Sequence, residues 1–276
     1  MVISTRGLLG LVLFAGVGFS ESNPEWHRAF PPFRIAGSLY YVGTADLAAY
    51  LVHTSQGEIL INTNLIQDLP ALKKNIQQVG FKFEDIKYVL ISHAHFDHDE
   101  ATGVAKRETG AKVLVMAEDA DEEERTSAER PGVHVDRRLR DGEMVGLGAA
   151  KLVAHLTPGH TPGCTTWTLR VSNLNAVIVG SPNVLSGYRL VGKETYPHMA
   201  ADFVKTFAVL KNLPCDIFLG AHGSYFGLKE KYAKFKAGDA NAFVDPAGYA
   251  TWVAAKEKEF RDEWARQKAG LKNAPL

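Results

Sequence analysis

The chain has 276 residues, of which 46% are hydrophobic, so it can bury a sizeable core in one large or two small domains. Its 31 lysines and arginines are balanced by 31 aspartates and glutamates. A chain without net charge has no field that attracts a polyanion such as RNA, which counts against a nucleic-acid partner.

The first twenty residues have the pattern of a secretory signal peptide. Arg6 precedes an apolar run from Gly7 to Phe19, and Ser20-Glu21-Ser22 follows it. The run is shorter than the roughly 20 apolar residues that a membrane span needs. We therefore expect residues 1–20 to be removed on export to the periplasm, and residues 21–276 to form a single domain without a membrane anchor.

Short strand-like segments open the expected domain. They comprise residues 34–35, 39–42, 48–53 and 57–61, and Asn62 begins the turn that ends this meander. Residues 70–79 then place apolar side chains on one helical face. The pattern predicts the start of a sheet, followed by a helix.

A metal-binding pattern stands at the end of the next apolar run, residues 86–91. His93, His95, Asp97 and His98 fall within six residues. If the run is a buried strand, His93 and His95 point the same way at its end and can share one ion. Asp97 and His98 then turn toward a second position nearby. The spacing therefore predicts a site for two cations.

Two further histidines stand just past later strand-like segments and are flanked by glycine. His160 follows residues 151–156, and His222 follows residues 216–219. Glycine lets the backbone bend close to a metal, so we expect both histidines to complete the site. Four other histidines lack partners at ligand spacing and are interpreted as structural: His27, His53, His134 and His155.

With these residues identified, the chain resembles the metallo-β-lactamase superfamily from about Pro32 to the C-terminus. Four segments look like the third subclass of true metallo-β-lactamases: Thr-Pro-Gly-His-Thr-Pro-Gly-Cys-Thr-Thr-Trp at 157–167, Gly187-Tyr188, Tyr196-Pro197-His198 and Leu-Pro-Cys-Asp at 213–216. The resemblance implies an α/β fold, the αββα sandwich, with a dinuclear zinc site along one edge.

The resemblance also implies how the site works. We expect one zinc ion on His93, His95 and His160 and a second on Asp97, His98 and His222. A metal-bound hydroxide would hydrolyse the β-lactam amide bond of penicillins, cephalosporins or carbapenems without an acyl-enzyme. Asp97 would both bind a zinc ion and hold the hydroxide in line.

Substrate contacts are expected from two loops near the site. Residues 187–197 lie between two ligand-bearing strands and should border the active site. Tyr188 is a candidate donor to the lactam carbonyl oxygen, with packing as the alternative role. Ser181 and Asn183 are candidates for holding the substrate carboxylate.

Three departures from the superfamily pattern bear on function. Ser181 stands near the point where glyoxalases, lactonases and nucleases place a bridging aspartate, which favours a lactamase over those hydrolases. Asp99 and Glu100 replace small residues; we expect them to face solvent at a helix start, the alternative being a perturbed second metal. The polar segment 118–140 offers only Val133 and Val135 as apolar residues for a substrate groove.

Other functions stay open at this point. A lactonase or thioesterase would use the same hydroxide, and a zinc-binding relative could lack catalysis. We expect a monomer that binds a small-molecule substrate. Cys164 is interpreted as a buried small residue, and no disulfide is expected from Cys215 because residues 245–249, which match the partner region of relatives, contain no cysteine.

Overall fold

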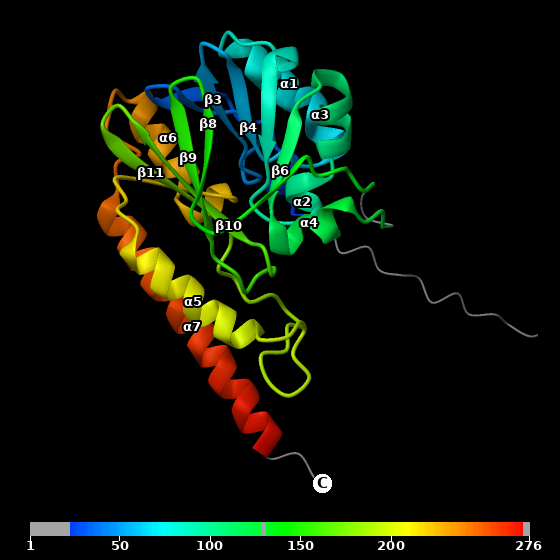
Figure 1. Cartoon of the computed structure of the whole chain (residues 1–276). Helices are drawn as coiled ribbons and strands as arrows, with labels where there is room; N and C mark the ends of the chain where they lie inside the picture. The colour runs from blue at the N-terminus through cyan, green and yellow to red at the C-terminus, as the bar shows by residue number, and fades with distance from the viewer. Residues whose placement is uncertain (1–22, 128–130, 273–276) are drawn as a thin grey trace, which may run out of the picture.

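The structure is a computed structural model that describes residues 23–127 and 131–272 (Figure 1). The expected signal peptide, residues 1–20, lies outside the described residues. Among the residues that are described, none of the helices combines the length and the apolar character that a bilayer span requires.

The first sheet has seven strands in the order β1 to β7. Strands β1 to β4 form the expected antiparallel meander, and β4 to β7 run parallel. Parallel neighbours need a crossover, and helices between successive strands supply it. The strands are β1 (Phe33–Ala36), β2 (Leu39–Tyr41), β3 (Tyr50–Thr54), β4 (Gly57–Ile61), β5 (Ile86–Leu90), β6 (Lys112–Met116) and β7 (Arg137–Leu139).

The second sheet has five strands in the order β12-β11-β10-β9-β8. Strands β8 to β11 are antiparallel, and β12 pairs parallel to β11 after a helical crossover. The strands are β8 (Glu143–Leu147), β9 (Ala150–Leu156), β10 (Thr165–Val171), β11 (Leu174–Val179) and β12 (Ile217–Gly220).

Helices cover the outer faces of the two sheets. Figure 1 shows α1 and α3 on one side of the molecule and the paired helices α5 and α7 on the other. The α-helices are α1 (Leu69–Gln78), α2 (Phe96–Asp99), α3 (Thr102–Thr109), α4 (Ala117–Glu124), α5 (Met199–Asn212), α6 (Leu228–Lys236) and α7 (Pro246–Lys272). Four 3-10 turns are η1 (Pro24–Trp26), η2 (Ile66–Asp68), η3 (Phe83–Asp85) and η4 (Gly223–Tyr225). The expected αββα sandwich is confirmed.

Two apolar cores hold the layers together. The larger joins the inner faces of both sheets around the fully buried Trp167 and continues to Phe203 and Phe260 of the α5–α7 pair. The smaller lies between the first sheet and α1 and α3, and includes Leu72 and Ala105. Because the layers are fixed in this way, loops from the ends of β5, β9 and β12 meet at one edge.

The segment expected to be merely polar, residues 118–140, contains regular structure. Most of α4 and all of β7 fall within it. Acidic residues dominate the exposed face of α4, while Ala120 and Glu123 are buried. The sequence did not predict α4, because Ala120 is its one buried apolar side chain and a single such residue gives no helical periodicity.

Candidate metal centre

His93 and His95 lie in a tight loop rather than at the end of a strand. Strand β5 ends at Leu90, and the His95 N–H donates to the His93 carbonyl at 2.9 Å, which bends the chain at Ala94. The two rings are nonetheless neighbours, with centroids 4.9 Å apart. The expectation that both rings project together holds, but a turn produces it and not strand alternation.

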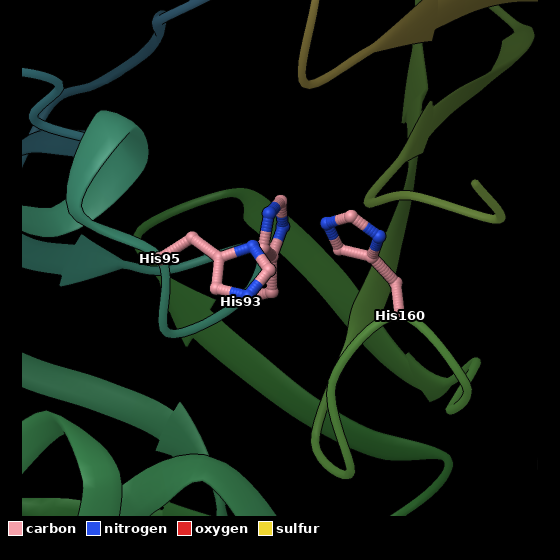
Figure 2. A group of neighbouring side chains, drawn as sticks. All are labelled: His93, His95 and His160. Carbon is pink, nitrogen blue, oxygen red and sulfur yellow. The ribbon is translucent and has the colours of Figure 1, made fainter. Parts of the chain in front are cut away.

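His160 reaches these two rings from the loop between β9 and β10. Its ring centroid lies 4.7 Å from those of both His93 and His95. Figure 2 shows the three rings converging from two separate segments of chain. One nitrogen from each ring falls within 4.8 Å of the others. We call His93, His95 and His160 the three-histidine cluster.

Asp97, His98 and His222 form a second group, the aspartate cluster. His98 Nε2 lies 3.2 Å from His222 Nε2, and Asp97 Oδ2 lies 3.2 and 3.5 Å from these two nitrogens. Two donors that each lie about 2.1 Å from a zinc ion at a tetrahedral angle are about 3.4 Å apart. The donor types and the spacing of this cluster therefore suit zinc.

His93 lies between the two clusters. Its ring centroid is 4.3 Å from that of His98, and its nitrogen also falls within 4.8 Å of donors on Asp97 and His98. We assign His222 to the aspartate cluster because its Nε2 lies 3.2 Å from His98 Nε2 and 3.5 Å from Asp97 Oδ2. The two candidate sites are therefore adjacent, as a dinuclear centre requires.

Burial sets the protonation of these groups. It lowers the pKa values of His93, His98 and His160 well below the usual range, and the neighbouring imidazoles lower them further. A neutral imidazole is the form that binds a metal. Burial also raises the pKa of Asp97, against the effect of the nearby imidazoles. A cation would offset that burial and favour the carboxylate.

Asp46 orients His222, and sequence reasoning missed it. Its Oδ2 lies 3.1 Å from His222 Nδ1 and its Oδ1 accepts the Ser224 N–H at 2.9 Å. Although burial opposes ionisation, the hydrogen bond and charge of His222 bring the pKa of Asp46 to about 2. A carboxylate that holds Nδ1–H leaves Nε2 free for a metal. Nothing in the surrounding sequence distinguishes this aspartate from a surface residue.

Other ligands are held by main-chain and hydroxyl groups. His160 Nδ1 lies 2.8 Å from the Asn183 carbonyl, and His93 Nδ1 lies 3.1 Å from Ser92 Oγ. Asn62, which begins the turn after β4, accepts the Ser92 N–H at 2.9 Å. Its amide nitrogen is 3.5 Å from His98 Nδ1, at the limit of a hydrogen bond. Asn62 therefore fixes mainly the backbone of the ligand loop.

A cavity of about 1090 Å³ opens onto both clusters. Asn183 and Tyr188 line it, and the Tyr188 hydroxyl donates to the His160 carbonyl at 2.8 Å. Ser181 is 2% exposed and is not among the lining residues; its hydroxyl lies 3.0 Å from that of Tyr225, which does line the cavity. Asn183 also donates to the Tyr225 hydroxyl, at 2.7 Å. Tyr225 is a site residue that the sequence did not reveal.

The apolar lining of the cavity does not come from the 118–140 segment, as expected, but includes Trp26 near the start of the described chain. Val133 and Val135, expected in the groove, are buried between the first sheet and its helices. Their N–H groups donate to α4, to the Glu123 carbonyl and the Glu124 carboxylate respectively. Trp26 instead lines the cavity, with its ring 6.2 Å from that of Phe96 and 6.1 Å from that of His222. The 118–140 segment contributes polar lining residues: Glu118, Asp119, Asp121, Glu122, Arg125 and Ser127.

The expectation that Asp99 faces solvent is wrong. Asp99 is only 2% exposed, because the chain after β4 covers the single turn of α2. The N–H groups of Thr63 and Asn64 both donate to the His98 carbonyl, at 3.0 and 3.1 Å. Glu100, in contrast, is half-buried and accepts the Ile66 N–H at 2.9 Å.

The remaining histidines and cysteines lie outside the two clusters. His27, His53, His134 and His155 each contact a carboxylate or hydroxyl of a neighbouring element. Both cysteines are free thiols, with Cys164 buried beneath the β9–β10 loop and Cys215 half-buried near the start of β12.

Comparison with known proteins agrees with this geometry. Residues 47–171 match the Metallo-beta-lactamase superfamily. The native FEZ-1 metallo-beta-lactamase from Legionella gormanii is 46% identical, with a TM-score of 0.85 over 87% of this chain and 98% of that chain. BJP-1, a subclass B3 metallo-beta-lactamase of Bradyrhizobium japonicum, is 36% identical, with a TM-score of 0.84 over 90% and 98% of the two chains.

A curated relative from another branch matches over a shorter stretch. A hydroxyacylglutathione hydrolase from Methylobacterium sp. is 30% identical over 102 residues, which are 37% of this chain. The match spans about a third of that relative, 35% of its length. The structural matches cover nearly all of both relatives, and residues 47–171 match the family model. The chain therefore belongs to the metallo-beta-lactamase superfamily, is a hydrolase of that fold, and shares its structure with subclass B3 members.

Proposed function

We propose that the protein hydrolyses the β-lactam amide bond of penicillins, cephalosporins and carbapenems with the help of two zinc ions. The observation that carries the proposal is Ser181, just after β11. Hydrolases of this fold that act on esters place a bridging aspartate near this point. Here the side chain is an uncharged hydroxyl, 2% exposed, that pairs with Tyr225.

The three-histidine cluster would hold one zinc ion and the aspartate cluster the other. When bound, the pair would supply a water molecule ionised near neutral pH and a Lewis acid for the lactam carbonyl. Asp97 can accept a hydrogen bond from that water and keep it in line with the carbonyl carbon. The oxygen of that water would add to the carbonyl carbon and the C–N bond would break, while the proton lost by the water would go to the leaving nitrogen. No bond to the protein forms.

Polar side chains that line the cavity would hold the substrate. The Tyr188 hydroxyl would exchange its bond to the His160 carbonyl for one to the lactam carbonyl oxygen. Asn183 lines the cavity and can donate its amide to the substrate carboxylate. Because Ser181 lies behind the lining residues, we propose that it contributes through the hydroxyl of Tyr225.

A chromogenic cephalosporin tests the proposal. The zinc-loaded protein should hydrolyse it, a chelator should abolish the reaction, and added zinc should restore it. Turnover that survives complete removal of zinc would contradict the proposed chemistry.

A second candidate is a thioesterase or lactonase, which the similarity to a hydroxyacylglutathione hydrolase favours. The same zinc pair would open a thioester or a lactone ring. Rates for a glutathione thioester and a homoserine lactone, measured beside the cephalosporin, separate these activities by kcat/KM. Zinc binding with no hydrolysis of any of the three substrates would indicate a non-catalytic relative.

We also propose that the protein is exported and acts as a periplasmic monomer. The charged start and apolar run before Ser20 support the export. The mass of the protein recovered from the periplasm would give the cleavage point, and size-exclusion chromatography with light scattering would give the number of chains.

A further inference from the structure

The three-histidine cluster is assembled from two different sheets. His93 and His95 follow β5 of the seven-stranded sheet, whereas His160 follows β9 of the five-stranded sheet. In the part of the chain that the structure describes, the two sheets share no paired strands. The packing of the two sheets brings the ligand loops to one edge, and contacts between the loops then set the distance between them.

One carboxylate, that of Asp119 in α4, contacts both loops. Its Oδ2 accepts the Ala94 N–H at 3.0 Å and the Thr161 hydroxyl at 2.6 Å, and its Oδ1 accepts the Gly163 N–H at 2.6 Å. Ala94 lies between His93 and His95. Thr161 directly follows His160. The Asp119 carboxylate thus accepts hydrogen bonds from both ligand loops.

The pocket around this carboxylate is closely fitted. Asp119 is 1% exposed, and hydrogen bonds to a buried charged acceptor are short and strong. A Cβ atom at Gly163 would lie 2.4 Å from the Asp119 backbone nitrogen and 2.6 Å from its Cβ. Glycine is therefore required where the β9–β10 loop approaches α4.

A separate backbone contact joins the same regions farther from the ligands. The Thr165 N–H donates to the Ser92 carbonyl at 2.7 Å, where β10 begins. This bond joins the loops where β10 begins. The Asp119 contacts lie beside the imidazoles, at Ala94 and Thr161.

We propose that Asp119 is a positioning residue that sets the spacing of the three-histidine cluster and so its affinity for zinc. This inference rests on the proposed zinc site but not on the identity of the substrate. Asp119 acts on the ligands through the residues beside them, by accepting from the Ala94 and Gly163 N–H groups and from the Thr161 hydroxyl.

Replacing Asp119 by Asn tests this role. An amide has one acceptor oxygen, so its NH2 group must face at least one donor that the carboxylate now accepts. Loss of a group that orients ligands typically weakens metal binding by about 10–100-fold. We expect Asp119→Asn to show this loss of zinc affinity at the three-histidine cluster and to keep the wild-type affinity at the aspartate cluster.

Asp216→Asn is the matched control. The Asp216 carboxylate also accepts a backbone N–H, from Asn175 at 2.8 Å, as well as the Asn175 amide at 2.9 Å. It stands before β12 and does not line the cavity. Both donors reach the same oxygen, Oδ2, so Asp216→Asn can keep these contacts and should not change zinc affinity.

The measurement is competition of each zinc-free protein with a chromogenic chelator for zinc, together with the absorption spectrum of the cobalt-loaded protein. Thermal unfolding of the zinc-free forms reports stability separately. Asp119→Asn should lose affinity at one site and alter the cobalt spectrum, whereas Asp216→Asn should do neither. Equal zinc affinities in the two variants would overturn the proposal. Wild type that binds no zinc would instead overturn the proposed function.

A second pair of variants covers the case in which Asp119→Asn does not fold. Thr161→Val removes one of the three donors, and Thr161→Ser keeps the hydroxyl. The serine variant should bind zinc more tightly than the valine variant. Equal affinities for the pair would contradict a role for this contact.

Discussion

Asp46 provides a sharp test of how the aspartate cluster is held. Its two carboxylate oxygens serve two different partners, His222 Nδ1 at 3.1 Å and the Ser224 N–H at 2.9 Å. In Asp46→Asn only one of these can find an acceptor oxygen. The variant keeps the main-chain bond from the Gly223 N–H to the Asp46 carbonyl, so the local backbone should persist.

The size of the effect follows from the lost bond. A hydrogen bond to a charged acceptor contributes about 1.5–3 kcal/mol, which corresponds to roughly 10–150-fold in a binding constant. We therefore expect Asp46→Asn to bind one zinc ion about 10–100-fold more weakly, in line with the effect of losing a group that orients a metal-binding histidine. The three-histidine cluster should keep its affinity.

Asp68→Asn is the control for this experiment. Asp68 makes the same kind of contact, with Oδ2 2.9 Å from His27 Nδ1, but neither residue belongs to a cluster. Zinc affinities would be measured by titration of the zinc-free variants against a chelator of known affinity. If Asp46→Asn binds both zinc ions as tightly as Asp68→Asn does, the orienting role of Asp46 is refuted.

Three further predictions concern the cavity, the core and the thiols. Tyr188→Phe should lower kcat/KM for a cephalosporin about tenfold while zinc content by mass spectrometry stays at the wild-type level; unchanged kinetics would exclude a donor role. Phe203→Ala removes a fully buried ring and should cost about 3–5 kcal/mol in urea unfolding; a cost below about 1 kcal/mol would contradict the packing. Burial raises the pKa of Cys164 and Cys215 to about 12, so at pH 8 both stay thiols, and iodoacetamide should label them only after unfolding. Rapid labelling of the native protein would refute this.

The sequence predicted those parts of the site whose residue types are rare and closely spaced. His93, His95, Asp97 and His98 are metal-binding types within six residues, and the structure places His160 beside them as the glycine-flanked loop suggested. Their roles as ligands stay a prediction. The boundaries of the predicted strands also agree closely, because each of them carries a short apolar run between polar turns, whereas β7 was missed because two of its three residues are arginines.

The residues that position the ligands could not be predicted in the same way. Asp46 and Asp119 are single aspartates in polar surroundings, and their functions depend on which N–H groups the fold brings to them. The burial of Asp99 likewise depends on a loop from another part of the chain. Val133 and Val135 show the opposite error, since an apolar side chain in a polar segment can face the core as readily as a groove.

The most direct test of the account is the zinc content of the purified protein and of two variants, His160→Ala and His222→Ala, after dialysis against metal-free buffer. Each variant removes one histidine from one cluster. We predict two zinc ions per wild-type chain and one in each variant. One ion or none in the wild type, or two ions retained in either variant, would contradict the assignment of these side chains to two adjacent zinc sites.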